Sequence, residues 1–170
     1  MSSNAVGDAL IAAAKYRFVE ESLPRIEKWF GLLTDEEIWF RPNSETVSVG
    51  NLVLHLCGNV RQWMIFGLGG GEDKRVRALE FSERGPLPRE ELLGRLRQTV
   101  KEAEAVLDGI DRESLHAPRR VQGETETGAG IILHVVEHFS YHTGQITYFV
   151  KSRKNIDTGY YAGQDLNVRG

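Results

Sequence analysis

The chain has 170 residues, of which 41% are hydrophobic and 26% charged, and its formal net charge is −3. This length and composition are typical of one soluble globular domain with a sizeable core, so we expect a single domain over residues 1–170. The small negative charge and the lack of a long basic run argue against nucleic acid as a partner. The sequence contains no apolar stretch of about 18 residues that would span a membrane.

The single cysteine, Cys57, excludes an intramolecular disulfide bond and a multi-cysteine zinc site. The N-terminal segment lacks the early basic cluster and the apolar core of a secretory signal, so we expect a cytoplasmic location. The expected partners are a small-molecule substrate and, in a homodimer, a second copy of the chain.

Residues 4–30 are predicted to form the first helix, because apolar residues recur there at three- and four-residue intervals. Pro24 is expected to kink or split this helix, since proline lacks the N–H group that a helix interior requires. Thr34, with Glu37 three residues later, is typical of a capping box that opens a short further turn.

Residues 48–67 are predicted to form the second helix, with Ser48 as its N-cap residue. His55 lies at the edge of the apolar stripe of this helix, about 100° from the centre of the stripe. Cys57 points about 200° away from His55 on the same projection. We therefore interpret Cys57 as a small buried hydrophobic residue and not as a ligand beside His55.

The glycine-rich segment 67–87 is predicted to be a connector. It is long for a compact domain, and such connections are usually functional or cross from one element to a distant one. We interpret its charged run EDKRVR, residues 72–77, as solvent-exposed surface. Residues 89–110 keep a helical period with a charged outer face, so they are predicted to form a third helix that serves as scaffold.

Residues 111–127 form a polar segment without a helical period. Glu113 and His116 have the Glu-x-x-His spacing that occurs twice in di-iron bundles. Here the spacing occurs once, shortly before Pro118, so we consider it incidental. The tail beyond residue 154 also lacks a clear period, and we expect it to pack irregularly.

Residues 127–154 are predicted to form the fourth helix, which carries three of the five histidines. His134, His138 and His142 are four residues apart, a spacing that turns successive side chains by about 40° and places all three on one face. Two imidazoles at this spacing can bind the same ion, as in the two-histidine helical zinc motifs. In the alternative, each is a core histidine that bonds to another protein group, and the chain is a structural bundle.

The segments HLCGNVRQW (55–63) and HFSYHTGQI (138–146) resemble the DinB/YfiT-like superfamily of proposed metalloenzymes. The resemblance covers most of the chain, and RVRALEF (75–81) is similar to the arginine-rich element of one DinB branch of unknown function. It implies an all-α fold, a four-helix bundle with a long crossover between helices two and three. The long glycine-rich connector agrees with that topology.

The resemblance also implies a site for a divalent metal ion. In the family, one histidine of helix two and two of helix four bind the metal, and the matching residues are His55, His138 and His142. His134 matches a position that the family often fills with histidine but does not generally use as a ligand. Three neutral imidazoles leave positions open for water or substrate, and zinc, nickel and iron(II) all suit imidazole.

Some relatives use low-molecular-weight thiols in transfer or isomerisation reactions, and many have no known activity. Our leading hypothesis from this resemblance is a metal-dependent enzyme that transfers a low-molecular-weight thiol to a small electrophilic substrate. A metal-dependent hydrolase and a non-catalytic metal- or ligand-binding stress protein are the alternatives. No side chain is assigned as nucleophile, because a metal would activate the thiol or a water molecule. Asn59 and Gln145 are candidates for contacts with the ligands or the substrate, unless they only join helices.

Overall fold

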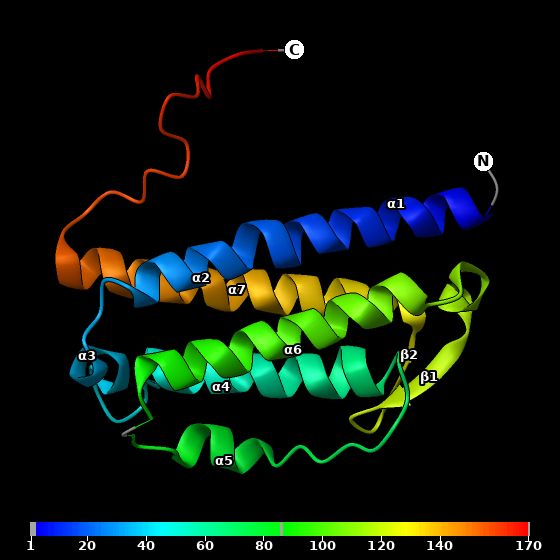
Figure 1. Cartoon of the computed structure of the whole chain (residues 1–170), viewed down its shortest axis with the longest axis horizontal. Helices are drawn as coiled ribbons and strands as arrows, with labels where there is room; N and C mark the ends of the chain where they lie inside the picture. Colours follow the sequence, from blue (N-terminus) through cyan, green and yellow to red (C-terminus); the bar gives the residue numbers. More distant parts are fainter. Residues whose placement is uncertain (1–2, 86, 170) are drawn as a thin grey trace.

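The computed structural model describes residues 3–85 and 87–169 and is built mainly of helices (Figure 1). The α-helices are α1 (Ser3–Lys15), α2 (Leu23–Phe30), α3 (Asp35–Trp39), α4 (Val49–Val60), α5 (Arg77–Ser82), α6 (Arg89–Gly109) and α7 (Gly128–Lys154). Two π-helical segments, η1 (Tyr16–Ser22) and η2 (Arg61–Phe66), and one 3-10 helix, η3 (Arg112–His116), accompany them. Strands β1 (Pro118–Val121) and β2 (Glu124–Thr127) form an antiparallel hairpin. Among the described residues, none of the helices has the length and apolar character needed to cross a membrane.

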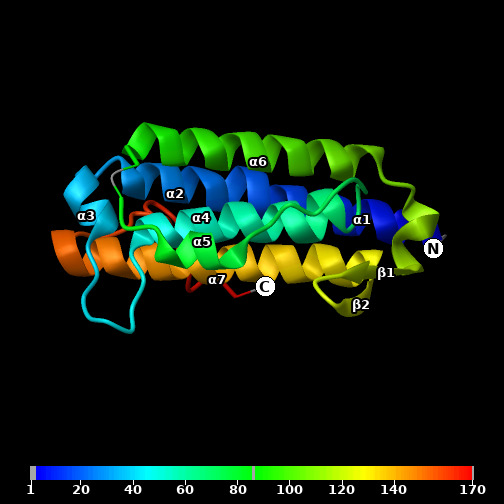
Figure 2. The ribbon, with the colours of Figure 1, turned by 90° about the horizontal axis from the view of Figure 1, so that it is seen from below.

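Four long helical rods lie side by side, which confirms the predicted all-α bundle (Figures 1 and 2). One rod is the continuous run α1–η1–α2, the second is α4–η2, and the other two are α6 and α7. The segment between η2 and α6, which carries α5, runs back along α4, so that α4 and α6 begin at the same end of the bundle (Figure 1).

Aliphatic and aromatic side chains from all four rods fill the core. Phe18 of η1 and Phe139 of α7 meet edge to face, with ring centroids 4.7 Å apart. Trp29 and Phe30 at the end of α2 are fully buried as well. Burial of this much apolar surface is the main stabilising term of a bundle, and it does not depend on a bound ion.

The predicted helix starts are confirmed by their caps. The Thr34 hydroxyl accepts a hydrogen bond from the Glu37 N–H, and the Glu37 carboxylate accepts one from the Thr34 N–H. Ser48 and Asn51 form the same reciprocal pair at the start of α4. Thr127 accepts from the N–H of Gly130 and so caps α7. These bonds satisfy N–H groups that the first turn of a helix leaves without partners.

The irregularity expected at Pro24 is a π-helical segment and not a break. Segment η1 ends directly before α2, and the N–H of Leu23 donates to the carbonyl of Phe18, five residues back. The wider turn accommodates the proline ring, which cannot donate a hydrogen bond, while the rod stays continuous.

The polar segment 111–127 contains a hairpin that the sequence pattern did not predict. Gln122 and Gly123 at its tip have φ angles of 52° and 83°. Positive φ at both central residues is typical of a type I′ turn, whose twist matches that of the two flanking strands.

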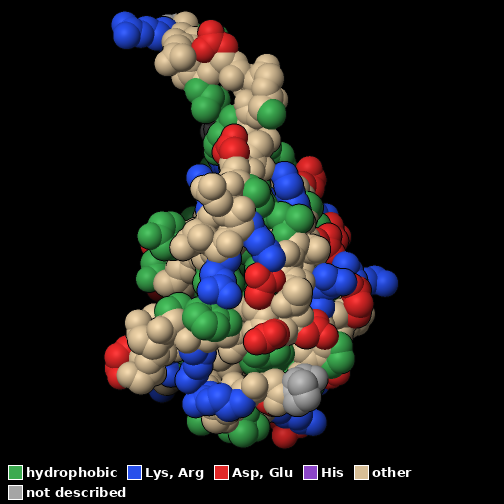
Figure 3. Space-filling view, turned by 90° about the vertical axis from the view of Figure 1, so that its left-hand side faces the viewer, with side chains coloured by type: hydrophobic (Ala, Val, Ile, Leu, Met, Phe, Trp, Pro, Cys, Tyr) green, Lys and Arg blue, Asp and Glu red, His purple; other side chains and the backbone are tan. Residues whose placement is uncertain are grey.

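The segment after α7 is anchored to α2 through Thr158 and Tyr160 and then leaves the bundle (Figures 1 and 3). The Tyr160 hydroxyl accepts a hydrogen bond from Nε1 of Trp29, and the Arg25 guanidinium lies 4.2 Å from the centre of the Tyr160 ring. Beyond this anchor the tail lacks helices and strands through residue 169, as its sequence predicts, but it is exposed and leaves the bundle, so the expectation that it packs irregularly is wrong there.

Candidate metal centre

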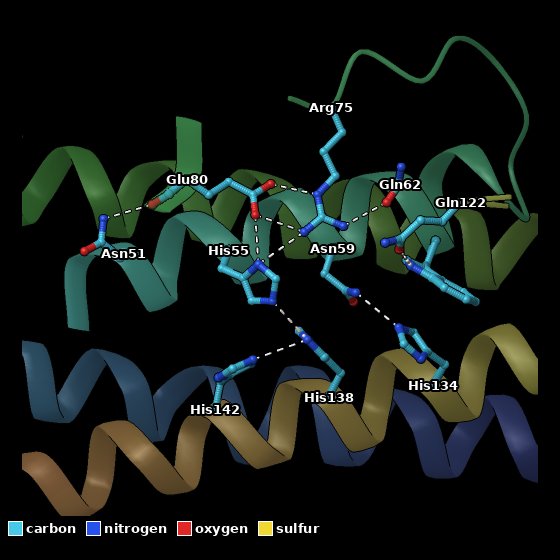
Figure 4. A network of polar contacts seen from close by, with 11 residues as sticks. Asn51, His55, Asn59, Gln62, Arg75, Glu80, Gln122, His134, His138 and His142 are labelled. Carbon is cyan, nitrogen blue, oxygen red and sulfur yellow. Dashed lines mark hydrogen bonds and ion pairs between the residues drawn. The ribbon is translucent and has the colours of Figure 1, made fainter. Parts of the chain in front are cut away.

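Three imidazoles from two rods point toward one another between α4 and α7 (Figure 4). The Nε2 atom of His138 lies 3.1 Å from Nε2 of His55 and 3.3 Å from Nε2 of His142. The three candidate ligand atoms all lie within 4.8 Å of one another. In a tetrahedral site with zinc–nitrogen distances of about 2.0–2.1 Å, nitrogen atoms are roughly 3.3 Å apart. The two distances from His138 match this spacing, so the three histidines could hold one ion.

The partners of the two outer histidines decide which ring nitrogen carries the proton. Nδ1 of His55 lies 2.8 Å from Oε2 of Glu80. Nδ1 of His142 lies 2.7 Å from Oε1 of Gln145. Carboxylate and amide oxygens accept hydrogen bonds, so both Nδ1 atoms donate, and in the neutral form of each ring Nε2 keeps its lone pair. A guanidinium nitrogen of Arg75 lies 3.2 Å from Nδ1 of His55, but it donates to the same Glu80 oxygen at 2.9 Å.

The Nε2 atom of the middle histidine, His138, faces the Nε2 atoms of both His55 and His142. Burial, together with the neighbouring imidazoles of His142 and His55, lowers the pKa of His138 to about 3, so the ring is neutral near pH 7. Its Nδ1 atom is buried and has no hydrogen-bond partner among the described residues. A proton on Nε2 of His138 would satisfy only one of the two facing lone pairs. A cation at the convergence point would satisfy all three nitrogens, so the donor set fits a divalent metal.

The fourth histidine of this region, His134, lies outside the group. Its Nε2 atom is 3.1 Å from Nδ2 of Asn59, which donates to it. Its ring stacks on Trp63, with centroids 3.8 Å apart. The two candidates for accessory contacts therefore have different roles: Gln145 bonds to a member of the triad, whereas Asn59 holds His134.

The connector contributes a buried ion pair to the centre. Arg75 donates from Nε to Oε1 of Glu80 at 2.7 Å and from a terminal nitrogen to Oε2. Burial acts to raise the pKa of Glu80, but the hydrogen bonds from Arg75 and His55 outweigh it and lower the pKa, so Glu80 is ionised. The interpretation of residues 72–77 as solvent-exposed surface is wrong for Arg75, whose side chain is only 5% exposed. Sequence reasoning also missed Glu80, whose one available indication was its place in the RVRALEF segment.

Cys57 and the Glu-x-x-His pair lie away from the triad, as predicted. Cys57 faces α6 and lines a cavity of about 1170 Å³ between α4, the connector and α6. Burial raises the pKa of its thiol to about 11. Glu113 and His116 belong to η3 and are not part of the histidine group.

Comparisons with known proteins agree with this architecture. The family described as "Protein of unknown function (DUF1572)" matches residues 6–160. A DinB-like protein from Bacillus subtilis superposes with a TM-score of 0.64 at 15% identity, covering 86% of this chain and 93% of that one. A DinB-like protein from Bacillus cereus gives 0.61 at 16% identity, covering 84% and 97%. A conserved protein from Enterococcus faecalis gives 0.64 at 15% identity, covering 92% and 99%. Identities this low show a shared fold only, and no curated protein matches the chain.

Proposed function

The chain belongs to the DUF1572 family of proteins of unknown function and has a DinB-like fold, and from this premise we propose that it binds a divalent metal ion through His55, His138 and His142. The observation that carries the proposal is the convergence of three Nε2 atoms, two of which have lone pairs fixed by their Nδ1 partners. The residues that the structure describes leave these nitrogens incompletely satisfied, and one cation would complete them.

The donor set favours a catalytic site over a closed structural one. Three protein ligands leave coordination positions for a guest, whereas structural zinc sites have four. When bound, a divalent cation supplies Lewis acidity, which lowers the pKa of a water molecule or a thiol that reaches it. Imidazoles bind a metal in their neutral form, and Glu80 is paired with Arg75, so these groups would leave the charge of the ion uncompensated. That charge balance favours an anionic guest such as a thiolate.

We propose that the guest is a low-molecular-weight thiol and that the reaction transfers it to a small electrophile. The thiol loses its proton to solvent, its sulfur forms a bond to the electrophilic carbon, and the leaving group departs with the displaced electron pair. The chain does not supply this sulfur itself, because its single cysteine is buried on the side of α4 that faces α6, with a pKa of about 11. A thiolate is the reactive form, so a thiol with so high a pKa is inert near pH 7.

The test uses protein loaded with cobalt(II), whose absorption spectrum reports its ligands. Addition of a low-molecular-weight thiol is expected to shift the spectrum, because sulfur enters the coordination sphere. Turnover of that thiol with an electrophile should persist in Cys57→Ala and be lost in His138→Ala. No spectral shift with any common thiol, combined with metal-dependent hydrolysis of an ester or amide, would replace thiol transfer with a hydrolase. Metal binding without any turnover would leave a non-catalytic binding protein.

A further inference from the structure

We propose that Glu80 is a positioning residue for His55 and that Gly58 provides the space this role requires. The inference rests on the proposed function only where it concerns metal affinity, because the orientation of His55 is a property of the metal-free protein. The connector would then position a candidate ligand as well as join the second and third rods.

The carboxylate of Glu80 has little freedom to move. Arg75 donates hydrogen bonds to both of its oxygens, at 2.7 and 2.9 Å, and two such bonds from a planar guanidinium hold a carboxylate in one orientation. The remaining direction of Oε2 is taken by Nδ1 of His55 at 2.8 Å. The ring of Phe81, the next residue, lies 4.9 Å from the imidazole of His55. The end of α5 therefore both bonds to this histidine and covers it.

Both ends of the connector segment that carries the pair are fastened to the second rod (Figure 4). Before α5, Arg75 donates to Oε1 of Gln62 at 2.8 Å. At the end of α5, Nδ2 of Asn51 donates to the carbonyl oxygens of Glu80 and Glu83, each at 2.9 Å. Because Asn51 and Gln62 flank His55 along the same rod, these bonds fix Glu80 in register with the imidazole.

Gly58 lies where the ion pair meets α4. A Cβ atom built on Gly58 would be 1.9 Å from Oε1 of Glu80 and 2.9 Å from Nε of Arg75. Any side chain at this position would thus push the pair away from the helix. Glycine inside a helix costs about 1 kcal/mol relative to alanine, so helix propensity alone opposes it here. The close approach of Glu80 gives a physical reason for this glycine.

The expected effect of Glu80 is to keep the proton of His55 on Nδ1 and the lone pair of Nε2 aimed at His138. Carboxylates that bond to the outer nitrogen of a metal-binding histidine typically change metal affinity about 10–100-fold. Without Glu80, the ring of His55 is free to rotate and to exchange its proton between the two nitrogens.

The experiment compares four variants with the wild type by nitrogen-15 NMR of labelled histidines in metal-free protein and by zinc titration. Glu80→Ala and Gly58→Ala should lose the pure Nδ1–H form of His55 and bind zinc about 10–100-fold more weakly. Glu80→Gln should restore much of both, because an amide oxygen also accepts from Nδ1. Gly94→Ala on α6 is the matched control and should change neither, because its added Cβ meets no atom within 4 Å. Circular dichroism confirms that each variant is folded.

An unchanged His55 proton position and unchanged zinc affinity in folded Glu80→Ala or Gly58→Ala would overturn the inference. Its failure is distinguishable from failure of the metal site. If the wild type binds no zinc but His55 still loses its fixed proton in Glu80→Ala, the positioning role stands and the metal proposal falls. If zinc binds the wild type and every variant equally, the metal site stands and the positioning role falls.

Discussion

The imidazole of His134 stacks on the indole of Trp63, with ring centroids 3.8 Å apart and ring planes inclined by 24°. Asn59 donates to Nε2 of His134 from the neighbouring rod, and Trp63 donates through Nε1 to Gln122 at the hairpin tip. His134 therefore joins α7, the second rod and the hairpin. This histidine is held by packing, although it lies one helical turn from a candidate ligand on the same face of α7.

Replacement of His134 by alanine is expected to leave metal content unchanged and to lower stability. The variant loses the stack on Trp63 and leaves the buried amide of Asn59 without its partner, a cost of about 1–3 kcal/mol in the free energy of unfolding. Urea denaturation measures the loss, and elemental analysis measures the metal. Loss of metal from this variant, at a level comparable to His142→Ala, would show that His134 is a ligand.

The stability of the metal-free protein is expected to increase with pH in the acidic range. Burial and the neighbouring His142 and His55 lower the pKa of His138 from 6.5 to about 3, and burial also lowers the pKa of His134 and His142. The unfolded chain, in which histidines titrate near 6.5, binds more protons than the folded chain between these values. The free energy of unfolding therefore increases as the pH rises from about 3 to about 6.5.

Urea denaturation of metal-free protein at about pH 5.5 and about pH 7.5 measures this dependence. Both pH values lie above the pKa of most carboxyl groups, which therefore stay ionised. His138→Gln is the matched variant, and its stability should change less between the two conditions than that of the wild type. An equal change in both proteins would show that His138 does not carry the dependence.

Removal of the metal is expected to leave the helices formed. The core contains apolar side chains from all four rods, in contrast to a zinc finger, which has no core of its own. Circular dichroism after chelation should keep its helical signal, while the melting temperature decreases because a ligand of the folded state has been withdrawn. Conversion to a coil spectrum would show that the ion has a structural role.

The periodicity of apolar residues was sufficient to predict the four helical rods. The fourth helix was predicted over residues 127–154 and is observed as Gly128–Lys154, because its N-cap Thr127 and its apolar period are both local signals. The hairpin was missed for the converse reason. Its strands are four residues long and rich in arginine, glutamate and threonine, and Gln122–Gly123 is a weaker turn signal than Asn–Gly.

The candidate site was predictable only in part. Helical spacing alone places His138 and His142 on one face, but their proximity to His55 on another rod came from the family resemblance. Arg75 and Glu80 illustrate what local patterns omit. Charged residues in a long polar connector are normally solvated. These two are buried because they pair with each other, and because Glu80 also accepts a hydrogen bond from His55. Only tertiary structure reveals that pairing.

The most direct test of the metal centre is the metal content of purified protein and of three variants, measured by elemental analysis. Wild type and His116→Ala should hold about one divalent ion per chain, because His116 lies outside the triad. His55→Ala and the double variant His138→Ala/His142→Ala should each lose most of it, since one or two of the three converging nitrogens are gone. Full metal occupancy in the double variant would contradict the account.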